Sequence, residues 1–351
     1  MIDYRKKENR LEGFLRYYYS ILKSEDYDPA YYTLRYLIKR YELNFEQQFW
    51  LCWLYGFIYN VATAWVVLNE FPDFENVDLG RLTQWENEHW RKMNYETDTR
   101  YKKGKIQVAL PDYLNRVREF ETQKEYFNHL CSSEDRIKNF QNLWLSINDF
   151  KLFGRYSTFF YSETLSEVMK LPITCDSLFL RDVSGSKSHR NGLCYSLGKD
   201  EWDLHKSNPS FLGYSKEMLD FLETSADEIL GKMKSRFQDI AHRVDYFTAE
   251  TAWCAYKGFY RKRRYLGFYL DRDAEQIVEA EHSGFPGIDW SVFWQCRSEN
   301  LQKNHLCENL NYRAPRKEYQ SLFAETGQIM NLDWYFKDES KFTIYNLGYL
   351  F

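Results

Sequence analysis

Twenty consecutive residues without a charged side chain, from Phe49 to Leu68, constrain the fold of this chain more than any other feature. A run of about that length matches a membrane-spanning helix. Two observations favour a helix in a protein core instead: Gly56 and the polar Asn60 lie in its middle, and an acidic segment with Pro72 follows it. The mean hydropathy of the whole chain is also low, at −0.65. We therefore predict one long buried helix that ends before Pro72, and no contact with a membrane.

Apolar residues recur at helical spacing along most of the remaining chain, whereas the alternation typical of strands is rare. The segments expected to form helices are 10–24, 29–43, 80–94, 113–130 (after Pro111), 134–149, 154–170, 215–237 and 248–284. No internal repeat and no linker rich in Gly and Ser divides the sequence. It therefore predicts a mainly α fold, with a single multi-helical catalytic domain over residues 1–351. If the domain has two intimate lobes, they are expected to meet near the polar segment 174–210.

Charge and cysteine content restrict the location of the protein and the sites that it can carry. The formal net charge is −4, so an anion site requires a local cluster of cations. The seven cysteines form no CxxC pair and no zinc-finger spacing with histidines. The first fourteen residues are charged and lack the apolar run of a secretory signal. These features predict reduced thiols in a cytoplasmic protein, with no bound metal and no cofactor.

The serine-rich segment, residues 184–192 ("SGSKSHRNG"), concentrates hydroxyls, glycines and cations. Hydroxyls, backbone N–H groups and two cations suit a phosphate group. The segment lacks the glycine spacing of a P-loop, so nucleotide hydrolysis is not supported. A solvated turn is the structural alternative. The predicted phosphate-binding residues are Ser184, Ser186, Lys187, Ser188 and Arg190, together with Arg155, which follows Gly154 at an expected helix start.

A second cationic cluster, the basic loop, comprises residues 100–105. Its cations are Arg100, Lys102, Lys103 and Lys105, and tyrosines lie close to them in the sequence. Such a combination suits a nucleic-acid backbone with stacked bases. A lone run of charges is equally typical of a solvated surface. We predict that the four cations contact DNA.

A third cluster runs from Arg261 to Arg264 and is followed by Asp271 and Arg272. If this stretch is helical, Arg264 and Asp271 lie about two turns apart on one face. An internal ladder of ion pairs is one interpretation of this cluster. The other is a site for a carboxylate ligand, because an arginine binds carboxylates through two parallel hydrogen bonds.

Four blocks of the sequence, 40–74, 152–165, 180–198 and 263–272, resemble the amino acid:DNA transferase family of tailed bacteriophages, also described as α-glutamyl/putrescinyl-thymine pyrophosphorylases. The resemblance implies a helical fold distantly similar to DNA glycosylases. It also implies hypermodification of thymine in phage DNA, in the cytoplasm of an infected bacterial host. In that pathway an amine, either an amino acid or a polyamine, displaces phosphate or pyrophosphate from the 5-methylene carbon of phosphorylated 5-hydroxymethyluracil.

The residues fit this chemistry. The target nucleotide has to leave the base stack, and aromatic residues, 19% of the chain, supply rings to hold it. The incoming amine has to lose a proton, for which Asp182 and His189 are the predicted catalytic residues. Arg263, Arg264 and Arg272 are the predicted partners of an amino-acid carboxylate. Two alternatives stay open: a base-flipping DNA glycosylase, which would cut the N-glycosidic bond, and a DNA-binding module without catalytic activity.

Overall fold

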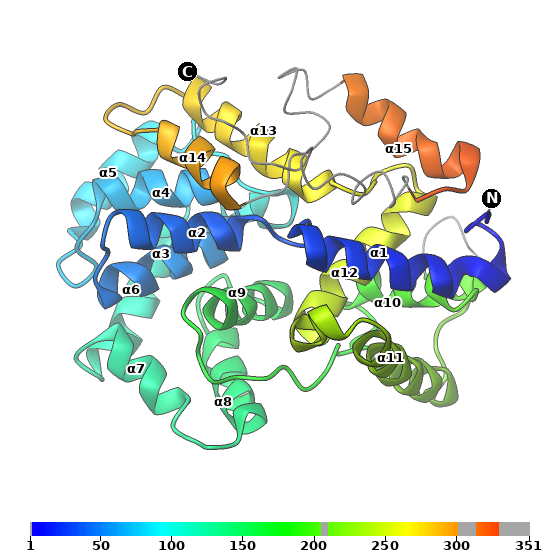
Figure 1. Cartoon of the computed structure of the whole chain (residues 1–351). Coiled ribbons are helices and arrows are strands. Elements are labelled where there is room, and N and C mark those ends of the chain that lie inside the picture. The colour runs from blue at the N-terminus through cyan, green and yellow to red at the C-terminus, as the bar shows by residue number, and fades with distance from the viewer. Residues whose placement is uncertain (1, 205–209, 301–313, 330–351) are drawn as a thin grey trace. The chain divides into compact units, whose positions relative to one another are not determined.

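The computed structural model describes residues 2–204, 210–300 and 314–329, and these residues form helices and no strand (Figure 1). The predicted mainly α fold is confirmed. The described residues group into two compact units. Those of unit 1 fall within 1–29, 177–272 and 301–345, and those of unit 2 within 30–176 and 273–300. One boundary between the units lies inside the polar segment 174–210. A single catalytic domain over residues 1–351 and the likeness to DNA glycosylases stay predictions.

Unit 1 is built around α12 (Tyr246–Tyr260), on which α1 and α10 both pack (Figure 1). The ring of Trp253 on α12 stacks on Phe14 of α1, with 5.1 Å between centroids. The other helices of the unit are α1 (Arg10–Ser24), α10 (Lys187–Ser196), α11 (Lys216–Arg236), α15 (Ala314–Thr326), η1 (Lys7–Asn9), η3 (Asp200–Trp202) and η4 (Gln238–Arg243). Helix α13 (Phe268–His282) begins in unit 1 and continues into unit 2.

Unit 2 is built around α3 (Phe45–Ile58), which packs on α4, α7 and α9. Residues 49–58 of α3 are all buried. The other helices of the unit are α2 (Ala30–Arg40), α4 (Val61–Glu70), α5 (Leu79–His89), η2 (Thr97–Lys102), α6 (Ile106–Arg118), α7 (Gln123–Leu130), α8 (Arg136–Asn148), α9 (Arg155–Val168) and α14 (Ser291–Asn300).

The uncharged run Phe49–Leu68 is buried as predicted, but it forms two helices, not one. Tyr59 ends α3 in the left-handed backbone conformation, with φ 56°. Asn60 then caps α4 by accepting a hydrogen bond from the Thr63 amide at 2.9 Å. Asparagine caps helices well because its side chain satisfies an N–H group that the first turn leaves unpaired. In the part of the chain that the structure describes, no helix combines the length and the apolarity needed to cross a membrane.

The helix predicted over residues 113–130 is also two helices. Pro111 does not precede the first of them but lies inside α6. Glu121, with φ 67°, interrupts the chain, and the Thr122 side chain then caps α7 by accepting from the Glu125 amide at 3.1 Å. The capping residue, rather than the apolar pattern, sets this boundary.

The prediction that Arg264 and Asp271 share one helix face is wrong. Helix α12 ends at Tyr260 and α13 begins at Phe268, so Arg264 lies in the connection between them. Asp271 lies in the first turn of α13 and accepts a hydrogen bond from the Tyr265 hydroxyl. Residues 261–271 therefore do not form the continuous helix on which an ion-pair ladder was predicted.

Candidate functional site

The serine-rich segment is a turn followed by a helix start, because α10 begins at Lys187. Asp182 organises the turn: its Oδ1 accepts hydrogen bonds from the Ser184 hydroxyl at 3.0 Å and from the Gly185 amide at 2.9 Å. Ser186 is buried, and its hydroxyl donates to the Phe179 carbonyl at 2.8 Å. Ser184, Gly185 and Lys187 are exposed. The exposed donors before α10 remain candidates for an anion, whereas Ser186 holds the turn in place.

Arg190 holds this turn in place through hydrogen bonds. Its side chain is fully buried, and its guanidinium lies over the ring of Tyr214, 4.7 Å from the centroid. Its terminal nitrogens donate to the carbonyl oxygens of Leu180 (2.9 Å), Asp182 (3.1 Å) and Val183 (2.7 Å). These contacts engage both terminal nitrogens, and the side chain is not accessible to a ligand in solvent. We therefore reassign Arg190 from phosphate binding to positioning of the turn.

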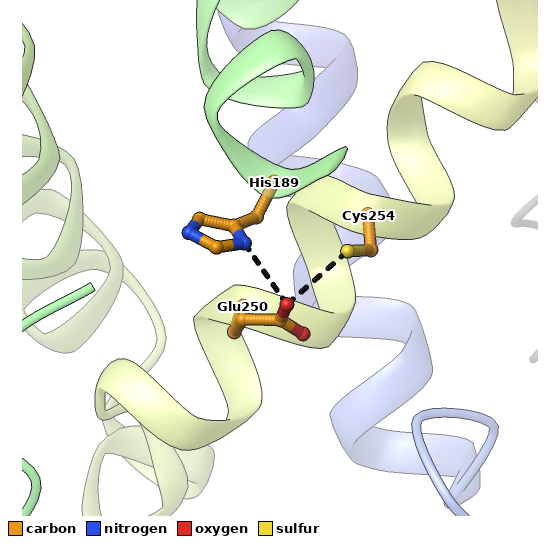
Figure 2. Close-up of side chains that lie close together, drawn as sticks. All are labelled: His189, Glu250 and Cys254. Atoms are coloured by element: carbon orange, nitrogen blue, oxygen red, sulfur yellow. Dashed lines mark hydrogen bonds and ion pairs between the residues drawn. The ribbon is translucent and has the colours of Figure 1, made fainter. Parts of the chain in front are cut away.

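His189, Glu250 and Cys254 form a compact group, the His189 cluster, where α10 meets α12 (Figure 2). The His189 ring is 1% exposed and has acceptors on both sides. Its Nε2 lies 2.8 Å from the Leu178 carbonyl oxygen, and its Nδ1 lies 2.9 Å from Glu250 Oε1. The Cys254 thiol donates to the same carboxylate oxygen at 3.4 Å. Because a carbonyl oxygen only accepts, we place a proton on Nε2.

A glycine makes this arrangement possible. A Cβ atom on Gly192 of α10 would lie 1.9 Å from the carbonyl oxygen of Trp253 on α12, so the two helices touch at their backbones. The Trp253 indole N–H also donates to the Ser196 hydroxyl at 3.3 Å. This crossing lies close to His189 on one helix and to Glu250 and Cys254 on the other, and it fixes the three side chains relative to one another.

Two cations from the same unit lie near the His189 cluster. Lys257, one turn after Cys254 on α12, donates to the Ser188 hydroxyl. Burial lowers the pKa of Lys257. The stem of Arg264 fills the space left by Gly258, where a Cβ atom would lie 2.2 Å from Arg264 Cγ. The guanidinium lies 4.0 Å from the ring centroid of Phe268, and its Nε is buried with no hydrogen-bond partner among the described residues.

Burial also shifts the pKa values of Cys254 and Tyr269, two further residues of this site. It raises the pKa of the Cys254 thiol, and the neighbouring Glu250 carboxylate acts in the same direction. It raises the pKa of the Tyr269 hydroxyl, although the Arg264 cation opposes this effect. Unit 1 thus brings a carboxylate, an imidazole, a thiol and two cations into one site that is largely sheltered from water. Such a combination of shifted groups is typical of sites that move protons.

The remaining predicted residues lie outside this group. Arg263 is exposed and Arg272 is half-buried. Arg155 is half-buried at the start of α9 in unit 2. In the basic loop, Arg100 and Lys105 are exposed and Lys103 is half-buried. Their roles stay predictions.

Lys102 differs from the rest of the basic loop, because its side chain is fully buried. Its Nζ donates to the Ser157 hydroxyl at 2.7 Å and lies 4.7 Å and 4.4 Å from the ring centroids of Phe57 and Phe153. Burial lowers the pKa of the Lys102 ammonium to about 7. A side chain in this position does not reach a DNA backbone, so we remove Lys102 from the predicted DNA contacts.

Sequence reasoning missed Glu250 and Lys257 as site residues and counted Cys254 only as a thiol. Glu250, Cys254 and Lys257 follow one another at steps of four and three residues, which places them on one face of α12. Their helix is otherwise rich in apolar residues, and polar groups at helical spacing in such a helix are the signal that could have found them. The contact of Glu250 with His189 spans 61 residues and has no signal in the local pattern.

The His189 cluster also has the composition of a metal site. The three ligand atoms, an imidazole nitrogen, a carboxylate oxygen and a sulfur, lie within 4.8 Å of one another. The expectation of a protein without a metal came from the spacing of cysteines and histidines along the sequence. That spacing carries no information about ligands from two separate helices.

Two comparisons relate the chain to known proteins. A model of the family described as amino acid:DNA transferase matches residues 22–265. A protein of Salmonella phage ViI that carries the name serinyltransferase is 26% identical over 358 aligned positions, which cover 97% of this chain and 86% of the phage protein. The matched range contains both α10 and α12 and therefore the whole His189 cluster.

Proposed function

The chain belongs to the amino acid:DNA transferase family, and from this premise we propose that it attaches an amino acid to phosphorylated 5-hydroxymethyluracil in phage DNA. It is an amino acid transferase that acts on DNA. The proposed reaction is displacement of phosphate or pyrophosphate from the 5-methylene carbon by the amine, in the cytoplasm of an infected bacterium. Because a relative is named serinyltransferase, serine is the first amino acid to test.

One observation carries the proposal: the buried His189–Glu250 pair beside two cations. An amino group is protonated at neutral pH, so it has to release a proton before it attacks the methylene carbon. The 2.9 Å contact between His189 Nδ1 and Glu250 Oε1 joins two acceptor atoms, so the pair can take up one proton between them. Of the two predicted catalytic residues, His189 fits this role better than Asp182, whose Oδ1 is engaged by Ser184 and Gly185.

The leaving phosphate and the amino acid both bring negative charge to the site. Ser184, Lys187 and Ser188 at the start of α10, with the side chain of Lys257, supply donors for the departing phosphate. Preorganised donors of this kind stabilise charge as it develops in the transition state. Arg155 belongs to unit 2, and its role as a phosphate ligand stays a separate prediction.

The amino-acid carboxylate is proposed to bind Arg264. This guanidinium is held by its aromatic neighbours and keeps a buried Nε without a hydrogen-bond partner in the described part of the chain. A carboxylate would satisfy that group, which is otherwise costly to bury. Arg263 and Arg272 remain alternatives. A polyamine has no carboxylate, so a preference for amino acids over polyamines would support Arg264.

The test uses duplex DNA that carries 5-phosphomethyluracil, with serine or a polyamine in excess. The DNA is digested to nucleosides, and mass spectrometry identifies the products. We expect a serine adduct from the wild-type protein and a rate at least about a hundredfold lower from Glu250→Gln at saturating DNA. The control variant is Glu228→Gln, at an exposed position on α11, which should keep the wild-type rate.

Other products would contradict the proposal. Abasic sites without an adduct would indicate a DNA glycosylase, and DNA binding without any product would indicate a non-catalytic module. If Glu250→Gln forms the normal adduct at an unchanged rate, the proposed reaction stands, but the His189–Glu250 pair does not take part in it.

A further inference from the structure

We infer that His189, Glu250 and Cys254 form a binding site for one divalent transition metal ion of the zinc class. The inference begins with two acceptors that face each other. His189 Nε2 points at the Leu178 carbonyl oxygen, so it carries the hydrogen and Nδ1 presents a lone pair. That lone pair lies 2.9 Å from Glu250 Oε1. Two acceptors at this distance need a cation between them, which is either a proton or a metal ion.

The ligand set favours zinc over hard cations. Imidazole nitrogen, thiolate sulfur and carboxylate oxygen are the ligands that zinc takes in proteins, whereas calcium and magnesium prefer oxygen alone. Glu250 and Cys254 lie one turn apart on α12 and present their ligand atoms on the same side, as Figure 2 shows. All three ligand atoms already lie within 4.8 Å of one another. Small side-chain rotations close this distance around an ion at roughly 2.0–2.3 Å from each ligand.

The surroundings hold the ligands in place. Metal-binding histidines usually donate their second N–H group to a carbonyl or carboxylate, and the Leu178 carbonyl has this position here. The backbone contact between Gly192 and Trp253 fixes α10 against α12. Cys254 is half-buried, whereas His189 and Glu250 are buried, so an ion can approach from the side of the thiol.

Charge balance is consistent with a divalent ion. A thiolate and a carboxylate together neutralise two positive charges, and the imidazole stays neutral. The nearby ammonium of Lys257 is directed to the Ser188 hydroxyl and is not part of the ligand set. Three protein ligands leave a fourth position open, as in zinc sites that also take a water molecule or another small ligand.

The test is a cobalt titration of the full-length protein after removal of metals with a chelator. Cobalt replaces zinc and gives a thiolate-to-metal absorption band only when a cysteine is bound. We expect one equivalent of cobalt and this band in the wild-type protein. Cys254→Ser should abolish the band, and His189→Ala should weaken zinc binding about tenfold or more in equilibrium dialysis.

Cys194→Ser is the matched control, because Cys194 is a buried thiol on α10 whose sulfur lies 3.9 Å from the Tyr214 hydroxyl and is not one of the three ligands, so the band should be unchanged. Circular dichroism checks that each variant folds, and Cys254→Ser keeps the size of the side chain. A wild-type protein without the band, or a band that survives Cys254→Ser, would overturn the site.

A second arm concerns activity and rests on the proposed function. A metal ion takes the lone pairs that are proposed to accept the proton of the amine, so saturating zinc should suppress transfer and a chelator should restore it. Metal binding without suppression would keep the metal site and contradict the proton-acceptor role. If cobalt does not bind but serine transfer is normal, the metal site is contradicted and the proton-acceptor role is kept. The two proposals therefore fail separately.

Discussion

The buried polar side chains of the site in unit 1 and the buried Lys102 of unit 2 have different surroundings. In unit 1, His189 faces a carboxylate and a carbonyl, and Arg190 donates to three carbonyls. In unit 2, Lys102 lies among aromatic rings, and its ammonium has one hydrogen-bond partner in the described structure, Ser157. A buried charge is stable only when other groups replace the water that it loses. Polar partners replace the lost water around His189 and Arg190, whereas aromatic rings and one hydroxyl replace it around Lys102.

The largest effect is expected where unit 2 packs its aromatic rings. Trp53 is fully buried and stacks on Phe57 and Tyr113, with centroid distances of 5.1 Å and 5.4 Å. Trp53→Ala should lower the free energy of unfolding by about 3–5 kcal/mol, because it removes a large apolar group and leaves a cavity. Denaturant unfolding measures this loss. Trp90→Ala is the control, since that ring is 37% exposed and should cost about 1 kcal/mol or less.

The next effect tests the helix crossing in unit 1. Gly192→Ala places a Cβ atom against the Trp253 backbone and should cost about 3 kcal/mol, with loss of the cobalt band and of transfer. On α11, a Cβ atom added to Gly231 would meet no other atom within 4 Å, so Gly231→Ala should be neutral or stabilise by up to about 1 kcal/mol. Equal unfolding midpoints for the two variants would show that the crossing is not a close contact.

Hydropathy predicted the buried helices better than it predicted the site. The run 49–68 is buried because it contains no charged side chain and is rich in apolar ones, and the periodicity of 10–24 matches α1 residue for residue. The errors arise where one polar side chain outweighs the pattern. Asn60 and Thr122 cap new helices inside segments whose apolar spacing continues unbroken.

The candidate site could be predicted only in part. His189 stood out because it lies among serines and cations in the sequence. Glu250 did not, because an acidic residue in an apolar helix is usually interpreted as solvent-exposed, and its burial depends on a partner from another helix. Arg190 and Lys102 were assigned to ligands from their charge alone. Whether a cation meets a ligand, a carbonyl or an aromatic ring is decided by tertiary contacts that the local sequence does not encode.

Lys102 allows the comparison to be tested by pH. Its pKa is about 7 in the folded chain, whereas an unfolded lysine titrates near 10.4. Between these values the unfolded chain binds the extra proton, so stability should rise with pH. Lys102→Met removes this term. The variant should have the higher free energy of unfolding, and its gap to the wild-type value should be largest at and below pH 7. This gap should shrink by up to about 1.4 kcal/mol per pH unit toward pH 10.

Urea unfolding at pH 6.5, 8 and 9.5 measures that gap. The difference between the two proteins, rather than the curve of either one, isolates Lys102 from the other titrating groups. A gap that stays constant over this range would mean that the ammonium is solvated in the folded state and that unit 2 does not exclude water from it.

The smallest effect distinguishes the exposed lysine of the basic loop from the buried one. Each phosphate contact contributes about one unit to the slope of log affinity against log salt for duplex DNA. Lys105 is exposed, so Lys105→Gln should flatten the slope by about one unit if the basic loop lies on DNA. Lys102→Met should leave the slope unchanged, because its ammonium is enclosed by Phe57 and Phe153. Fluorescence anisotropy at several salt concentrations gives both slopes. Flattening by Lys102→Met alone would place the buried lysine in the DNA interface and contradict its assignment to packing.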